Sequence, residues 1–385
     1  MNRDVATGVA SNGARTFLSA QVNRASRRTR MSALLALFLP LALNAATSGR
    51  QFTGWADFRQ FARSTNSAGE VEWLSPKTKC RPADEFIPSW NADLAPDGWL
   101  RVELRVFRGK QPTKFYDLGH WSRDASLHPR ESIKGQEDAD GDVDTDTLQL
   151  RAPADAFQFK LVLGPATNAA RLKLLALSAM DSKAATRPRE PLRSVWGKPP
   201  LDVPQRSQCA YPEGITKWCS PTTTSMLLAF WSEKLNRPEL NFEVPDVARS
   251  IHDTTWKGTG NWAFNMAFAG AQPGMRGYVT RFNDVRELEA WIASGHPVGV
   301  SLCSNRLRGV TNSPSGHLVV CVGFDQNGDV ILNNPGSLHE TRKTYSRAIF
   351  IHSWAYSKNT VYLVYPEGEK LPRDKFNHWS LRAAK

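Results

Sequence analysis

The sequence predicts two domains, an antiparallel all-β sandwich followed by an α+β domain. Three observations favour this division. The chain has 385 residues, enough for two domains of about 150 residues that each bury a core. Strand-like alternation fills residues 51–180, whereas helical patterns and then strand-like runs fill residues 201–366. Between them, residues 181–200 hold four prolines and five basic residues, which is typical of a solvated linker.

The N-terminal domain is predicted from segments in which apolar and polar residues alternate. They are Trp99–Val106, Thr147–Arg151 and Phe157–Leu163. A period of two places one face of each strand in a core and the other in water. Glycine and proline interrupt these segments, and no strong helical pattern lies between them. We therefore expect a sandwich of antiparallel strands and not a parallel sheet.

The C-terminal domain is predicted from helical patterns that precede strand-like runs. Thr222–Leu235 and Val285–Ile292 place apolar residues on one helical face. The strand-like runs that accompany them are Pro297–Leu302, Leu318–Phe324, Val330–Leu332 and Val361–Tyr365. Helices first and strands afterwards indicate an α+β architecture.

The charge distribution argues against a nucleic-acid-binding protein. Hydrophobic residues make up 41% and charged residues 22% of the chain, which excludes a disordered or collagen-like protein. The net charge of +12 is concentrated in three segments. They are residues 1–30 with six arginines and one aspartate, the linker, and a basic tail at 367–385. The rest of the chain is almost neutral, so we expect no basic groove and no nucleic-acid partner.

The first 46 residues have the organisation of a secretory signal. The basic residues Arg24, Arg27, Arg28 and Arg30 precede the apolar run 31–43, and small residues follow it. Met31 offers an alternative start. An N-terminal anchor helix is the other interpretation of this run. We predict export to the periplasm, cell surface or medium, with no transmembrane domain after signal removal. Export permits disulfides, but five cysteines leave at least one unpaired within the chain.

Four residues of the second domain are candidates for catalysis. Cys219 stands at the start of a predicted helix, where the positive end of the helix dipole lowers a thiol pKa, and Ser220 or a nearby threonine is a candidate cap. His317 begins an apolar strand and is placed to act as a base. Asn334 follows the next strand and is placed to orient an imidazole. Gln208 is a candidate oxyanion donor together with the Cys219 amide.

Each candidate also has a plain structural interpretation. Cys219 is equally compatible with a buried or disulfide-bonded cysteine, and His317 with a histidine in a surface turn. Asn334 precedes a proline, and both are turn formers. Gln208 is compatible with a surface polar residue. The order Gln, Cys, His, Asn along one domain is what favours a cysteine hydrolase.

The second domain resembles the papain-like cysteine peptidases related to the bacteriocin-processing, double-glycine leader peptidases. It is most similar to their free-standing secreted group, the peptidase C39-like proteins. The resemblance covers about residues 200–366. The segments that carry it are SQ at 207–208, WCSPTTTSM at 218–226, GHPV at 295–298, GHLVVCVGFD at 316–325 and NNPG at 333–336.

The resemblance implies a papain-like fold and hydrolysis of peptide bonds in a peptide or protein substrate, without a cofactor. It assigns Cys219 as nucleophile, His317 as base and Gln208 as oxyanion donor, with Gln205 a weaker substitute. Family members usually have aspartate where this chain has Asn334. Asparagine orients an imidazole but does not stabilise imidazolium by charge. This difference leaves open a degenerate, non-catalytic surface-binding protein as the alternative function.

The sequence contains only weak signals for a metal ion or a sugar as ligand. The histidines and cysteines have no zinc-site spacing, and the acidic run at 137–144 has its glycine in the wrong place for an EF-hand. The first domain contains five tryptophans that are candidates either for its core or for stacking on sugars, namely Trp55, Trp73, Trp90, Trp99 and Trp121. A cell-wall or glycan ligand of this domain is therefore one prediction, and a packing or substrate-presenting module is the other.

Overall fold

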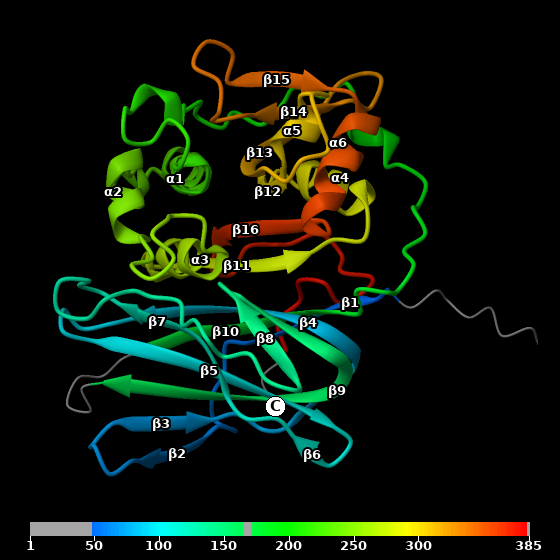
Figure 1. The fold of residues 1–385 in the computed structure, drawn as a ribbon. Helices are drawn as coiled ribbons and strands as arrows, with labels where there is room; N and C mark the ends of the chain where they lie inside the picture. Colours follow the sequence, from blue (N-terminus) through cyan, green and yellow to red (C-terminus); the bar gives the residue numbers. More distant parts are fainter. Residues whose placement is uncertain (1–47, 165–170, 383–385) are drawn as a thin grey trace, which may run out of the picture. The chain divides into compact units, whose positions relative to one another are not determined.

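The computed structural model describes residues 48–164 and 171–382 (Figure 1). The predicted signal region lies outside these residues. Within the described ranges, no helix is long and apolar enough to cross a membrane.

The N-terminal domain is an antiparallel, all-β structure. Its strands are β1 Arg50–Trp55, β2 Ala62–Thr65, β3 Val71–Leu74, β4 Thr78–Asp93, β5 Trp99–Arg108, β6 Gln111–Pro112, β7 Tyr116–Ser122, β8 Gly141–Asp144, β9 Thr147–Gly164 and β10 Arg171–Met180. The main path of the sheet is β1-β10-β4-β9-β3-β2, and β5 pairs with β9, β6 and β7.

The long strand β9 connects the two halves of this sheet. Its first half pairs with β8 and β4, and its second half pairs with β5 and β3. All ten strands therefore belong to one hydrogen-bonded network, and a division into two packed sheets stays a prediction. The alternation expected in Trp99–Val106 is present, since Leu100, Val102, Leu104 and Val106 are all fully buried.

The C-terminal domain combines helices with a six-stranded antiparallel sheet of order β11-β16-β12-β13-β14-β15. Its helices are α1 Cys219–Leu235, α2 Val244–Ser250, α3 Trp262–Ala271, α4 Val285–Ala293, α5 Ser304–Leu307 and α6 Arg347–Trp354, with 3₁₀ turns at Arg193–Val195, Gln208–Ala210, Pro238–Leu240 and Ala355–Ser357. Its strands are β11 Met275–Arg281, β12 Val298–Cys303, β13 Gly316–Phe324, β14 Val330–Asn333, β15 Arg342–Tyr345 and β16 Thr360–Pro366.

Helix α3 is an element that the sequence pattern does not predict. Its residues from Ala263 to Gly270 are all buried, so no polar face marks its period. The burial has a tertiary cause, because α3 packs against β11 of its own domain and also against β4 of the N-terminal domain. A helix covered on both sides needs no amphipathic stripe.

Asn91 of β4 forms the polar contact at the centre of this junction. Its Nδ2 donates to the carbonyl oxygens of Gly277, at 2.8 Å, and Met266, at 3.2 Å, and its Oδ1 accepts from the Gly277 N–H at 3.1 Å. Gly270 of α3 allows this approach, because a Cβ there would lie 2.0 Å from the Asn91 amide. One buried amide therefore satisfies backbone groups of α3 and β11 together.

The segment between the domains and the C-terminal tail both contact helix α4. Arg189 pairs with Asp284 at 2.7 Å, and the Trp196 indole donates to Glu289 at 2.8 Å. In the tail, the buried His378 hydrogen-bonds Glu287 of α4. Carboxylates at and along α4 therefore hold both segments against the C-terminal domain.

We predict that Asn91→Ala lowers the free energy of unfolding by about 2–3 kcal/mol, because buried backbone groups of Gly277 and Met266 lose their partner. Urea denaturation measures the change. Asn327→Ala is the control, since Asn327 is exposed in a turn. Equal stability of Asn91→Ala and wild type would contradict this account of the junction.

A second contact between the domains involves a buried carboxyl group. Asp146, in the turn between β8 and β9, accepts a hydrogen bond from the backbone N–H of Trp262, the first residue of α3. Burial raises the Asp146 pKa to about 7, and the neighbouring Asp144 and Asp253 charges act in the same direction. The folded protein therefore holds a proton there that the unfolded chain releases near pH 4.

We predict that Asp146 makes the folded state less stable as pH rises from about 4 to about 7. The raised folded-state pKa means that the unfolded chain binds fewer protons across this window. Asp146→Asn keeps an acceptor for Trp262 without the ionisation. Its stability relative to wild type, measured by denaturation at each pH, should grow across the window and then level off. A difference independent of pH would refute the assignment.

Candidate active site

Helix α1 begins at Cys219 without a side-chain cap. Trp218 is the N-cap residue, and within the described chain its side chain makes no capping hydrogen bond. The prediction that Ser220 or a threonine caps the helix is wrong. The Ser220 hydroxyl instead bonds the Tyr362 hydroxyl at 2.8 Å, and Thr222 Oγ1 donates to the Trp218 carbonyl at 2.6 Å. Within this first turn, Pro221 has no N–H and the Thr222 N–H bonds the Trp218 carbonyl, whereas the Ser220 N–H acts on the thiol.

Cys219 and His317 form a hydrogen-bonded pair that joins α1 to β13. Burial acts to raise the pKa of Cys219, but the hydrogen bond and charge of His317 and the backbone N–H groups of Leu318 and Ser220 bring it below its ordinary value. Burial likewise acts to lower the pKa of His317, and its bonds to Cys219 and Asn334 raise it. The two shifts favour a thiolate beside an imidazolium.

Asn334 orients the His317 ring. Its Oδ1 lies 2.8 Å from His317 Nε2, so Nδ1 is the ring nitrogen left for the thiol. Asn334 Oδ1 also accepts from the Gly336 N–H at 2.9 Å, and its Nδ2 donates to the Tyr345 hydroxyl at 2.9 Å. Both bonds fix the amide so that oxygen faces the ring.

Tyr345 is a site residue that the sequence analysis misses. It lies on β15 opposite Val330 of β14, and its hydroxyl reaches the amide of Asn334, four residues farther along the chain from Val330. No local motif surrounds it, and the residue becomes relevant only through this side-chain contact within the folded hairpin. Its hydroxyl accepts from the Asn334 amide and so acts on His317 indirectly.

Gln208 lies close to this group but faces another partner. Its backbone N–H donates to the Pro335 carbonyl at 3.0 Å, which places it beside Asn334. Its side-chain Nε2 donates to the Ile215 carbonyl at 2.6 Å, and its buried Oε1 has no hydrogen-bond partner within the described residues. Gln205 lies farther along, where its Oε1 accepts from the Arg342 N–H of β15. The structure therefore joins Cys219, His317 and Asn334 directly, with Gln208 adjacent.

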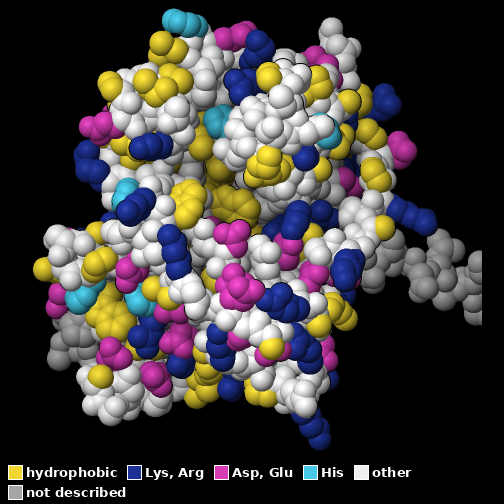
Figure 2. All heavy atoms as spheres, in the orientation of Figure 1, with side chains coloured by type: hydrophobic (Ala, Val, Ile, Leu, Met, Phe, Trp, Pro, Cys, Tyr) yellow, Lys and Arg dark blue, Asp and Glu magenta, His cyan; other side chains and the backbone are white. Residues whose placement is uncertain are grey.

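The site is partly open to solvent. Cys219 is half-buried and His317 is buried. Figure 2 shows a hollow on this face of the C-terminal domain, between the side formed by α1 and α2 and the side formed by the sheet, with apolar side chains inside it. All five cysteines are free thiols, including Cys209.

The other ligand candidates are occupied by protein contacts. Asp138 of the acidic run accepts from Tyr116, Asp140 and Gly141, and Asp140 pairs with Arg108. No group of three or more histidine, cysteine or acidic side chains in the described chain is placed to hold a metal. Three of the tryptophans considered for sugar stacking, Trp55, Trp90 and Trp121, are buried in the core.

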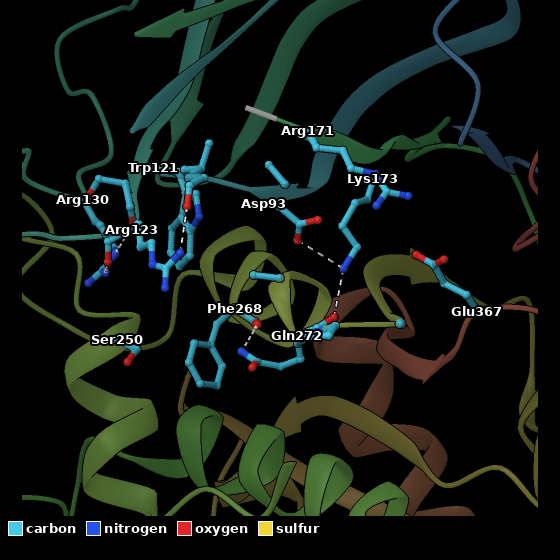
Figure 3. Close-up of a pocket in the computed structure, with 16 residues that line it drawn as sticks. Asp93, Trp121, Arg123, Arg130, Arg171, Lys173, Ser250, Phe268, Gln272 and Glu367 are labelled. Carbon is cyan, nitrogen blue, oxygen red and sulfur yellow. Dashed lines mark hydrogen bonds and ion pairs between the residues drawn. The ribbon is translucent and has the colours of Figure 1, made fainter. Parts of the chain in front are cut away.

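A cavity of about 590 Å³ lies at the domain junction, away from Cys219. Figure 3 shows its lining, in which Lys173 approaches Asp93 on one side and Gln272 on the other. Lys173 donates to the carbonyls of Gly270 and Gln272 at the end of α3, where a cation is favourable. Arg130 donates to the carbonyls of Ser122 and Arg123 in the β domain and to that of Arg249 in α2. These cations thus serve the junction.

Comparison with known families agrees with this geometry. Residues 200–362 match the model of the Peptidase C39-like family, and residues 42–182 match the model of the Peptidase C39 N-terminal domain. The protein is related to the C39-like peptidases. The first match contains Cys219, His317 and Asn334, and the second corresponds to the β domain.

Comparisons with solved structures and with curated proteins add little to the family relationship. A crystal structure of a proposed C39-like peptidase from Bacillus anthracis is 14% identical, with a TM-score of 0.30, and covers 49% of this chain and 100% of its own. No curated protein matches the chain. The family relationship therefore rests on the two family models.

We predict that alkylation of Cys219 by iodoacetamide has its pH midpoint below 9.0, the ordinary value for a thiol. In His317→Ala only burial and backbone amides remain, so the midpoint should rise. Mass spectrometry of the peptide containing Cys219 measures the rate at each pH. The matched control is His352→Ala, whose exposed imidazole contacts Asn312. An unchanged midpoint in His317→Ala would show that the pair does not activate the thiol.

Proposed function

We propose that the protein is an exported cysteine peptidase that hydrolyses peptide bonds with a papain-like arrangement of Cys219, His317 and Asn334. The observation that carries the proposal is the connected series of hydrogen bonds from the thiol to His317 to Asn334, with a lowered thiol pKa and a raised imidazole pKa. A purely structural cysteine needs neither shift. Cys321, for comparison, is buried in the sheet, and burial raises its thiol pKa.

In the first step, the Cys219 thiolate attacks the carbonyl carbon of the scissile bond and gives a tetrahedral oxyanion. The C–N bond then breaks as His317 donates its proton to the departing amine, which leaves a thioester on Cys219. In the second step, His317 takes a proton from water and the resulting hydroxide attacks the thioester. The carboxylic acid product departs, and the proton returns to the Cys219–His317 pair.

The neutral Asn334 suits this mechanism because charge is already balanced within the catalytic pair. The thiolate beside the imidazolium supplies the negative charge that an aspartate provides elsewhere. Asn334 needs only to hold the ring, and its bonds to Gly336 and Tyr345 keep its oxygen directed at Nε2.

Gln208 is the proposed oxyanion donor together with the backbone N–H of Cys219. Its amide now bonds the carbonyl of Ile215, four residues before Cys219 in the loop that leads to the helix. Reaching an oxyanion requires the Nε2 group to exchange or share this partner when substrate binds. Its backbone bond to Pro335 keeps it beside the site during that change.

Export and the role of the first domain belong to the same proposal. The basic and apolar segments of residues 1–46 support a secretory signal, with action in the periplasm, in the medium or at the cell surface. We propose a sandwich for the β domain, and its contacts with α3 favour a packing or substrate-presenting module over a glycan-binding one. The burial of Trp55, Trp90 and Trp121 supports the same choice.

We predict that the protein cleaves members of a library of fluorophore-quencher peptides and that Cys219→Ala abolishes cleavage. Gln208→Ala should lower kcat by about 100-fold with a smaller change in KM, because an oxyanion donor acts mainly in the transition state. Gln326→Ala, an exposed glutamine in the turn before β14, is the matched control. If folded, reduced wild type neither cleaves the library nor shows an activated Cys219, the degenerate surface-binding protein becomes the better description.

A further inference from the structure

Trp256 is a large aromatic side chain that the fold leaves exposed. It lies between α2 and α3, and 44% of its surface is accessible. In the helix that follows, α3, Phe264 and Phe268 are buried and Trp262 is half-buried. A single exposed apolar side chain is ordinary on a protein surface, so what distinguishes Trp256 is where it lies and how it is held.

The loop around Trp256 is held in one conformation by Asp253. Asp253 is fully buried, and its Oδ1 accepts from the backbone N–H of Trp256 at 3.0 Å and of Thr255 at 3.1 Å. The backbone of Asp253 also pairs with Gly258, with 2.9 Å between the Asp253 nitrogen and the Gly258 oxygen. The indole is therefore presented from a preorganised turn and loses little conformational entropy on binding.

Two glycines form the surface on which the indole rests. A Cβ at Gly258 would lie 2.5 Å from the ring, and one at Gly260 would lie 2.8 Å from it. The ring thus covers the Gly258–Gly260 backbone with one side and leaves the other accessible. Any larger residue at either glycine would displace it.

This turn is joined to the loop that precedes the nucleophile. Thr259, between the two glycines, donates from Oγ1 to the Lys217 carbonyl at 2.8 Å, and Lys217 is two residues before Cys219. Ile215 lies on the same preceding loop and is 49% exposed. The Ile215 carbonyl also holds the Gln208 amide. An accessible indole and an accessible aliphatic side chain therefore lie on two linked loops, one of which leads directly into Cys219.

We infer that Trp256 and Ile215 form a specificity subsite for a bulky apolar side chain, aromatic above all, of the peptide substrate. The inference rests on the proposed peptidase function and names the substrate class. Stacking on a fixed indole favours an aromatic side chain over a small one through both area and ring geometry. Trp256 is a binding residue here and takes no part in proton transfer.

The test compares two fluorophore-quencher peptides that differ only in Phe or Ala at the position of strongest preference in the library. Wild type should prefer the Phe peptide in kcat/KM. Trp256→Ala should reduce that preference by about five- to tenfold, mainly through KM, while its rate on the Ala peptide stays within about twofold. Trp256→Phe should retain most of the preference. Ile351→Ala, which removes an equally exposed apolar side chain on α6, should change nothing.

A second measurement separates this inference from the proposed function. The same two peptides are titrated against Cys219→Ala protein, with and without Trp256→Ala, by fluorescence polarisation. Cleavage by wild type with an unchanged Phe preference in Trp256→Ala overturns the subsite and leaves the peptidase standing. Absence of cleavage with Trp256-dependent binding of the Phe peptide overturns the peptidase alone. Absence of both overturns both, and an unchanged thermal midpoint shows that each variant is folded.

Discussion

The packing of helix α1 against the six-stranded sheet is the contact on which the rest of the site depends. Residues from Ser220 to Trp231 are buried. Gly299 of β12 permits the close approach, because a Cβ there would lie 3.2 Å from Leu227 and Thr223. The Ser220–Tyr362 bond fixes the start of the helix against β16. Cys219 has its position relative to His317 because the helix has little freedom to shift or rotate.

This packing also determines the electrostatics of the Cys219–His317 pair. Burying a thiol and an imidazole separately disfavours the charged form of each. Burying them in contact reverses the outcome, since each charged form stabilises the other. Asn334 adds orientation without adding charge. A neutral asparagine at position 334 is therefore compatible with an active Cys219–His317 pair.

An element could be predicted from the sequence where a hydrophobic run or a helical period marks it, and not where contacts with another domain or strand decide it. Strands β12, β13, β14 and β16 and helices α1 and α4 lie close to the ranges that hydrophobic runs and helical periods predict. Helix α3 was missed because the N-terminal domain covers the face that would otherwise be polar. The neighbours of β9 change along its length, and no alternation pattern specifies such a change.

Local sequence features specify the chemistry available to this protein: a cysteine at a helix start, a histidine at a strand start and an asparagine before a proline, in an order that resembles a peptidase family. These features are local, so they can be recognised along the chain. Tertiary structure alone decided which partners meet. It directed the Gln208 amide to Ile215, placed Tyr345 behind Asn334 and left Trp256 exposed on a glycine surface. Such contacts join residues through sheet register and loop packing, which no local pattern encodes.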